Sequence, residues 1–94
     1  GIGLWDDARA TLEDNKINNN ESHGINIGYE GTPNETVEIE ATRNRIQNNR
    51  GCGVWTDQDR GIRITGRGNT ISGNKGGNLC GDLSKFPRSF GGGR

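Results

Sequence analysis

The sequence predicts an all-β protein, a right-handed parallel β-helix (solenoid) of about three coils followed by a C-terminal tail. The first observation is internal repetition: residues 8–27, 37–56 and 62–81 align without a gap, as repeats of about 25 residues. The second is that apolar and polar side chains alternate with a period of two, which indicates half-buried strands rather than helices. We expect coils over residues 1–81 and a tail, which could cap the lower end, over 82–94.

Composition limits the size and the partners of the chain. Its 94 residues suffice for one domain at most, and a hydrophobic content of 27% leaves little apolar surface to bury. The 12 basic and 12 acidic side chains cancel, so we expect neither nucleic acid nor a membrane as a partner. No apolar run approaches the roughly 20 residues that cross a bilayer. Because Gly1 already reads as part of a strand, we expect a piece of something longer.

Four columns of the aligned repeats are apolar throughout, and we expect them to face the core. They are Ala8/Val37/Ile62, Ala10/Ile39/Ile64, Ile17/Ile46/Ile71 and Ile25/Val54/Leu79, with Ile2 continuing the last column one repeat earlier. Between them, the outward columns are Arg9/Glu38/Arg63 and Thr11/Glu40/Thr65. Opposite charges stacked about 4.8 Å apart attract each other, although an exposed pair contributes no more than about 1 kcal/mol.

Two further columns contain asparagine in every repeat. They are Asn15/Asn44/Asn69 and Asn20/Asn49/Asn74, in a chain with 12 asparagines altogether. Asparagine tolerates left-handed backbone geometry, and its amide both donates and accepts, so stacked copies can bond along the column. We therefore predict two asparagine ladders at the corners of the coils.

Short strands joined at asparagine corners and stacked in register resemble the pectin-lyase-like superfamily, most closely its generic β-helix repeats, such as those of periplasmic NosD-type proteins. The resemblance covers residues 1–81. The connections vary at one corner, over residues 5–7, 28–36 and 57–61. Insertions confined to one corner are typical of a solenoid, where that corner often forms the binding face.

The stretch 22–28, SHGINIG, resembles the Gly-His-Gly strand of the polygalacturonases, which implies a catalytic His23. That family pattern also places paired aspartates and an Arg-Ile-Lys strand along the same groove. Here Asp6-Asp7 precedes a different strand, and Trp55-Thr56-Asp57 stands where Arg-Ile-Lys belongs. We therefore expect His23 to be structural, at a position that aligns with Cys52 and Gly77.

Carboxylates in the variable loops are the other candidates for catalysis. Asp7, Asp57 and Asp59 join His23 as weak catalytic candidates, because a glycosidase needs two carboxylates about 5 to 10 Å apart. Without apolar surroundings, such side chains are ordinary solvated loop residues. No His or paired Cys stands at ligand spacing, so neither a metal site nor a cofactor is expected.

Three aromatic side chains are candidates for contact with a carbohydrate or a protein partner. Trp55 falls between the inward Val54 and Thr56 and should point outward, whereas Trp5 and Tyr29 enter the variable loops. Exposed rings suit stacking on sugars or burial against another protein. The equally weighted alternative is that the rings lie over their own loops.

The two cysteines have opposite strand parity. Cys52 should face inward and Cys80 outward, in different columns, so we do not expect a bridge between them unless the last coil is distorted. Free thiols or an intermolecular bond are the alternatives. A bridge would stabilise the fold by about 3 kcal/mol and indicate an oxidising compartment. The sequons at Asn20 and Asn34 also fit secretion.

The ends of the solenoid determine the functional hypotheses. A β-helix ends in unpaired backbone groups over an apolar core, which invites further strands. Leu83, Phe86 and Phe90 in the tail could cover the lower end. The leading hypothesis is a non-catalytic, secreted structural module that stacks on itself or on coils of a parent chain, with polysaccharide as a further contact. The alternatives are a fragment of a polysaccharide hydrolase or lyase, and a carbohydrate-binding module.

Overall fold

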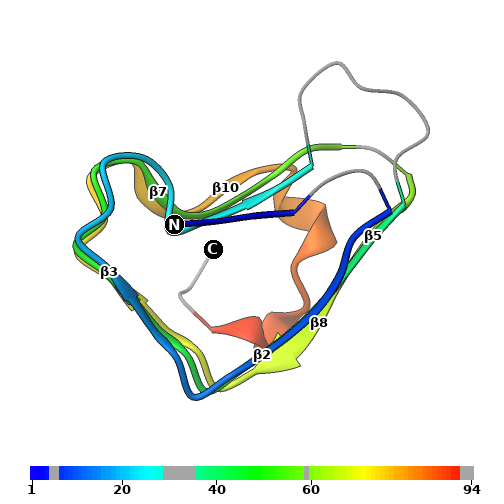
Figure 1. Ribbon diagram of the computed structural model, residues 1–94, viewed down its shortest axis with the longest axis horizontal. Helices are drawn as coiled ribbons and strands as arrows, with labels where there is room; N and C mark the ends of the chain where they lie inside the picture. Colours follow the sequence, from blue (N-terminus) through cyan, green and yellow to red (C-terminus); the bar gives the residue numbers. More distant parts are fainter. Residues whose placement is uncertain (5–6, 29–35, 59, 92–94) are drawn as a thin grey trace.

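In the computed structural model, which describes residues 1–4, 7–28, 36–58 and 60–91, the chain winds into a three-sided parallel β-helix (Figure 1). The strands are β1 (Ile2–Leu4), β2 (Arg9–Glu13), β3 (Lys16–Asn18), β4 (Ile25–Ile27), β5 (Val37–Thr42), β6 (Arg45–Gln47), β7 (Cys52–Thr56), β8 (Ile62–Arg67), β9 (Thr70–Ser72) and β10 (Gly77–Gly81). Two short 3-10 helices follow, η1 (Leu83–Lys85) and η2 (Arg88–Phe90). The predicted fold class is confirmed.

The strands form three parallel sheets, one on each side of the coil. The sheets have the orders β1-β4-β7-β10, β2-β5-β8 and β3-β6-β9, and we call them the first, second and third sheet. Every strand pair is parallel, and consecutive coils stack directly on one another. Each coil therefore contributes one strand to each side, as the repeat predicts.

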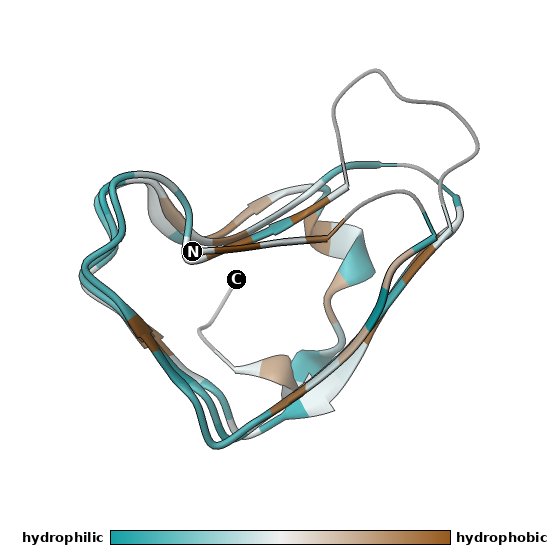
Figure 2. Ribbon diagram, in the orientation of Figure 1, coloured by the Kyte–Doolittle hydropathy of each residue, from teal (hydrophilic) through white to brown (hydrophobic). Residues whose placement is uncertain are grey.

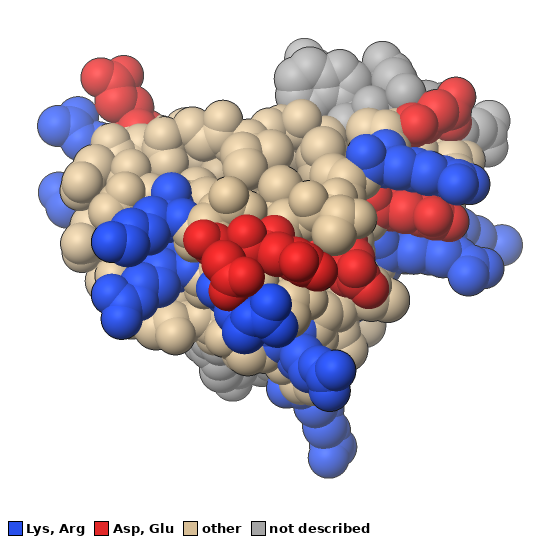
Figure 3. Space-filling view, turned by 60° about the horizontal axis from the view of Figure 1, so that its bottom comes forward, with Lys and Arg blue, Asp and Glu red and all other residues tan. Residues whose placement is uncertain are grey.

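The register of the sheets reproduces the aligned columns of the sequence. Ile17 lies opposite Ile46, which lies opposite Ile71, and Ile25 lies opposite Val54. These side chains are buried in one core, which Figure 2 shows as apolar bands on the sheets. On the outer surface, basic and acidic side chains alternate in bands (Figure 3), because Glu38 pairs in register with both Arg9 and Arg63.

Left-handed residues turn the chain at two of its corners. Between the second and third sheets they are Asp14, Arg43 and Gly68, and between the third and first sheets they are Asn19, Asn48 and Gly73. Each directly precedes a ladder asparagine. The ladder asparagines themselves have ordinary backbone angles, so their place at the corner follows from side-chain bonding rather than from tolerance of left-handed geometry.

The tail closes the lower end of the solenoid. Phe86 and Phe90 are 1% and 0% exposed, and their ring centroids lie 5.2 Å apart. The segment crosses the triangular section of the coil beneath the core (Figure 1) and forms a parallel bridge between Gly91 and Asn69. Asp82 is the N-cap of η1, and its side chain accepts a hydrogen bond from the backbone N–H of Ser84. These apolar rings replace the core that a further coil would otherwise supply.

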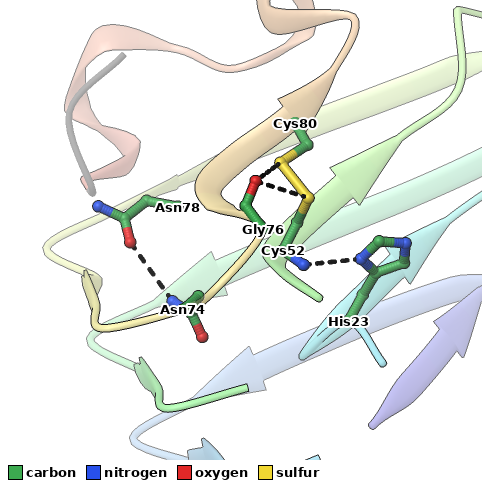
Figure 4. Close-up of a disulfide and its surroundings, with 6 residues drawn as sticks. All are labelled: His23, Cys52, Asn74, Gly76, Asn78 and Cys80. Atoms are coloured by element: carbon green, nitrogen blue, oxygen red, sulfur yellow. Dashed lines mark hydrogen bonds between the residues drawn. A yellow bond between two sulfur atoms is a disulfide. The ribbon is translucent and has the colours of Figure 1, made fainter. Parts of the chain in front are cut away.

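A disulfide joins Cys52 to Cys80, and the expectation that they would not bridge is wrong. Their Cα atoms are 6.1 Å apart, although Cys52 lies opposite Gly77 in register and Cys80 opposite Trp55. The last strand is distorted by a bend: Gly77 has φ of 114°, and β10 lacks the alternating burial of β2, β5 and β8. This bend brings the outward cysteine back to the inward one (Figure 4).

Candidate functional site

The first asparagine ladder runs through all three coils. The side-chain Oδ1 of Asn44 accepts from the backbone N–H of Asn15 at 2.9 Å and from its Nδ2 at 3.1 Å. Oδ1 of Asn69 accepts from the same two groups of Asn44, at 2.9 and 3.0 Å. The Nδ2 of Asn44 also donates backwards to the carbonyl of Leu12 at 2.8 Å. In each step, the N–H and Nδ2 of one asparagine donate to the Oδ1 of the next asparagine toward the C-terminal end.

The second ladder repeats this pattern at the next corner. Oδ1 of Asn49 accepts from the N–H and Nδ2 of Asn20, and Oδ1 of Asn74 accepts from those of Asn49. Nδ2 of Asn49 donates backwards to the carbonyl of Ile17 at 3.2 Å. Because Asn49 and Asn74 are buried at 1% and 9% exposure, these bonds satisfy polar groups that would otherwise be costly to bury.

Groups outside the two asparagine columns end both ladders at the C-terminal end. The carbonyl oxygen of Phe90 accepts from the backbone N–H of Asn69 at 3.2 Å and from its Nδ2 at 2.8 Å. It takes the two donors that the Oδ1 of a fourth asparagine would have taken. In the second ladder, Oδ1 of Asn78 accepts from Nδ2 of Asn74 at 3.4 Å.

At the other end the first ladder finishes in an open acceptor. Oδ1 of Asn15 accepts no hydrogen bond from the residues that the structure describes, although its N–H and Nδ2 both donate to Asn44. In the second ladder, Oδ1 of Asn20 accepts from the amino group of Gly1. The two ends of the solenoid are therefore chemically different.

We call the upper surface, made by the free edges of β1, β2 and β3, the N-terminal end face. Each of these strands pairs with described residues on one side only. Core side chains are only partly covered there: Ile2, Ala8, Ala10 and Leu12. A hollow of about 290 Å³ lies on this face, between Ile2, Leu12 and the two ladder residues Asn15 and Asn20. The face thus combines apolar surface, open strand edges and an unused asparagine acceptor.

The outer surface of the second sheet carries a shallow polar groove. It has a volume of about 470 Å³ and is lined chiefly by the two outward columns, Arg9/Glu38/Arg63 and Thr11/Glu40/Thr65. Arg9 and Glu38 form an ion pair at 3.6 Å, with the arginine side chain 77% exposed. An ion pair this exposed contributes little to stability. Its charges instead favour one register of neighbouring coils, in which an acidic side chain lies next to each arginine.

A second ion pair joins adjacent coils at the corner. Arg43 donates from Nε and Nη2 to the two carboxylate oxygens of Asp14, at 3.0 and 3.2 Å. The hydrogen bond from Arg43 lowers the pKa of Asp14 below its ordinary value and raises that of Arg43. Asp14 and Arg43 occupy the same column of the alignment, so the spacing that located the asparagines would also have located this pair.

His23 is held against the first sheet by a hydrogen bond to the backbone and by a ring contact with Trp55. Its Nδ1 accepts a hydrogen bond from the backbone N–H of Cys52 at 2.9 Å (Figure 4). Its ring stacks on that of Trp55, with centroids 6.1 Å apart and an interplanar angle of 12°. Trp55 is half-buried on the outer surface of the sheet. The Nδ1 atom of His23 therefore satisfies a backbone N–H of the next coil.

The structure separates His23 from the candidate carboxylate Asp57. His23 lies before β4 and beside the start of β7, whereas Asp57 follows the end of β7. The length of that strand, roughly 13 Å at 3.3 Å per residue, separates the two positions. Asp7 lies exposed at the variable corner with Asp57. Asp59, Trp5 and Tyr29 lie outside the described residues.

In the described part of the chain, no group of three or more His, Cys, Asp or Glu side chains could hold a metal ion. None of the helices there has the length and apolar character to span a membrane. What the sequence did not reveal is the role of the Phe90 carbonyl, because a backbone acceptor does not depend on residue type.

The stacked coils, the in-register columns and the asparagine ladders define a parallel β-helix solenoid. The chain belongs to the right-handed β-helix family, whose model, described as a right handed beta helix region, matches residues 1–85. Neither the curated proteins nor the solved structures contain a match to the chain.

Proposed function

We propose that this chain is a non-catalytic structural segment of a secreted β-helix, which stacks end to end on further coils of a longer solenoid or of another copy. One observation carries the proposal: both asparagine ladders are terminated at the C-terminal end, whereas the first ladder ends in an open acceptor at the N-terminal end face. A face that offers apolar area, free strand edges and an unused ladder acceptor is suited to another coil.

The non-catalytic part of the proposal rests on the contacts that His23 already makes. Its Nδ1 is bonded to a backbone N–H and its ring is stacked on Trp55, and the strand β7 lies between it and Asp57. A hydrolase or a lyase needs its acid and base within reach of one bond of the substrate. We expect no cleavage of pectin or alginate, and release of reducing or unsaturated ends that is lost in His23→Ala would contradict this.

Secretion is supported by the disulfide between Cys52 and Cys80, because such bridges persist in oxidising compartments. Its presence in protein taken from the native host, mapped by mass spectrometry without reductant, is the expected result. A fully reduced pair in that material would contradict secretion.

An extended chain tests stacking directly. A copy of residues 37–52, with Cys52→Ser, is placed before Gly1, so that Gly1-Ile2 continues it as Gly53-Val54 do in the natural repeat. The added segment would then lie over β2 and β3 in register. We expect the urea midpoint of unfolding to rise and the amides of β2 to exchange more slowly than in the chain without the added segment. An added segment with the same residues in scrambled order is the control, and an equal effect from it would contradict stacking.

A second candidate function, contact with polysaccharide, is favoured by the ring of Trp55 on the outer surface of the first sheet. His23 stacks on it and holds a flat aromatic surface in place, which suits the apolar face of a sugar. If glycans bind there, Trp55→Ala should abolish retention on a polysaccharide column, whereas Thr11→Ala on the second sheet should not. Equal retention of the two variants would exclude this surface.

A further inference from the structure

We propose that the N-terminal end face recognises one kind of partner, a parallel β-helix coil with an asparagine over Asn15 and an acidic side chain over Arg9. This inference rests on the proposed function and adds the polarity of stacking and the chemistry of the coil. The inference states which edge of an incoming coil can dock on this face and which residues of the face recognise that edge.

The ladder has a direction, and the direction determines what fits on Asn15. In both inner steps of the first ladder, the asparagine nearer the N-terminal end donates its N–H and Nδ2 to the Oδ1 below. The open Oδ1 of Asn15 therefore matches an asparagine that approaches from above. The backward bond from Asn44 to the carbonyl of Leu12 shows the second contact, since Nδ2 of Asn15 would reach the equivalent carbonyl of the incoming coil.

The charge column selects the same register. Arg9, Glu38 and Arg63 alternate along the outer surface of the second sheet, and the pair nearest the end face is joined at 3.6 Å. An acidic side chain stacked over Arg9 continues the alternation, whereas a basic one places like charges about 4.8 Å apart. Both the asparagine and the acidic residue are features of the repeat at 37–52, as Asn44 and Glu38.

A second copy of this chain does not supply that partner from its own C-terminal end. The donors of Asn69 that would meet Asn15 of another copy are already bonded to the carbonyl of Phe90. Phe86 and Phe90 also cover the core at that end. A head-to-head pair cannot continue the ladder either, because the backbone N–H of each Asn15 is bonded to Asn44 of its own copy. The occupant is therefore a β-helix coil with a free C-terminal edge.

The experiment compares three forms of the extended chain: the added segment unchanged, with Asn44→Ala in the added segment alone, and with Glu38→Lys there. We expect Asn44→Ala to lower the folding equilibrium constant about two- to tenfold, because the ladder bond from Nδ2 is lost while the bond from the backbone N–H remains. Glu38→Lys should lower it by about fivefold or less, and added salt should reduce that difference.

A double-mutant cycle identifies the acceptor. Asn15→Ala in the extended chain should remove most of the effect of the added asparagine, so that the two losses are not additive. Additive losses, or an added segment that stabilises equally with and without its asparagine, would overturn the inference while leaving stacking intact. Equal effects of the aligned and scrambled segments would instead overturn the proposed function.

Sedimentation of the chain without the added segment, at several concentrations, tests whether a second copy occupies the N-terminal end face. We expect a monomer across the range. The opposite result is a dimer or a series of larger oligomers that is absent from the extended chain. It would show that another copy occupies this face and would overturn the inference.

Discussion

The carbonyl oxygen of Phe90 accepts hydrogen bonds from both the backbone N–H and the side-chain Nδ2 of Asn69, at 3.2 and 2.8 Å. Asn15 and Asn44 each give the same two donors to the Oδ1 of the next asparagine. A backbone carbonyl thus stands in for a ladder residue, and it comes from the same residue whose ring closes the core. Phe90 therefore contributes to both the polar and the apolar closure of the C-terminal end.

The middle rung of the first ladder should be costly to remove. Asn44 is fully buried and its side chain takes part in four hydrogen bonds, so Asn44→Ala removes bonds to Asn15, Leu12 and Asn69. We expect a loss of about 2 to 4 kcal/mol in the free energy of unfolding, measured with urea. Asn15→Ala, at the exposed end of the same ladder, is the control and should cost about 1 kcal/mol or less. Similar losses at the two positions would mean that burial does not set the value of a rung.

The cap should depend on the ring of Phe90. Phe90→Ala removes a fully buried side chain, and we expect it to cost about 3 to 5 kcal/mol or to prevent folding. The matched variant Leu83→Ala, in the same tail but 39% exposed, should cost much less. Hydrogen exchange at the amide of Asn69 gives a local measure, and it should accelerate in Phe90→Ala alone. A Phe90→Ala protein as stable as the parent would show that the tail is not a cap.

The disulfide should contribute about 3 kcal/mol, because it closes a loop of 28 residues in the unfolded chain. We expect dithiothreitol to lower the urea midpoint of the parent protein. The double variant Cys52→Ala with Cys80→Ala should start at that lower midpoint and should not respond to dithiothreitol. A parent protein indifferent to the reductant would contradict this role.

Gly66 should tolerate no side chain. Its φ is 137°, and a Cβ atom there would lie 1.8 Å from the carbonyl oxygen of Ala41 in the neighbouring coil. Gly66→Ala must therefore push the coils apart, and we expect loss of the folded state at 25 °C by circular dichroism. Gly68→Ala nearby meets only Arg43 Cγ at 3.6 Å, so it should cost about 1 kcal/mol from its positive φ alone. Equal effects of the two changes would contradict the close approach of the coils at Gly66.

The ion pair between Asp14 and Arg43 should be visible in a titration. The hydrogen bond from Arg43 lowers the pKa of Asp14, so the group adds stability above the unfolded pKa of about 4 and loses it as the pH falls through the lower folded pKa. Arg43→Gln should return the pKa of Asp14 upward toward its ordinary value, as followed by carboxyl ¹³C shifts. Arg45→Gln is the control and should leave the pKa of Asp14 unchanged.

The alignment of three repeats predicted the sheets, the inward columns and their register, because stacked coils place equivalent residues one strand spacing apart. It placed the asparagines of each ladder in one column, and in the structure they bond to one another. The candidate catalytic residues were chosen by type and local resemblance. Such choices carry no information on the distance between His23 and Asp57, which depends on the length of the strand between them.

The sequence by itself determined the coil, because a repeat of matched apolar, charged and asparagine positions satisfies its groups in a single stacked arrangement. The tertiary structure decided how the coil ends. The bend at Gly77 that brings Cys80 to Cys52, and the path of the tail that brings the Phe90 carbonyl to Asn69, occur once each and follow no period. Backbone bends and backbone acceptors are set by the packing around them, so residue types alone do not reveal them.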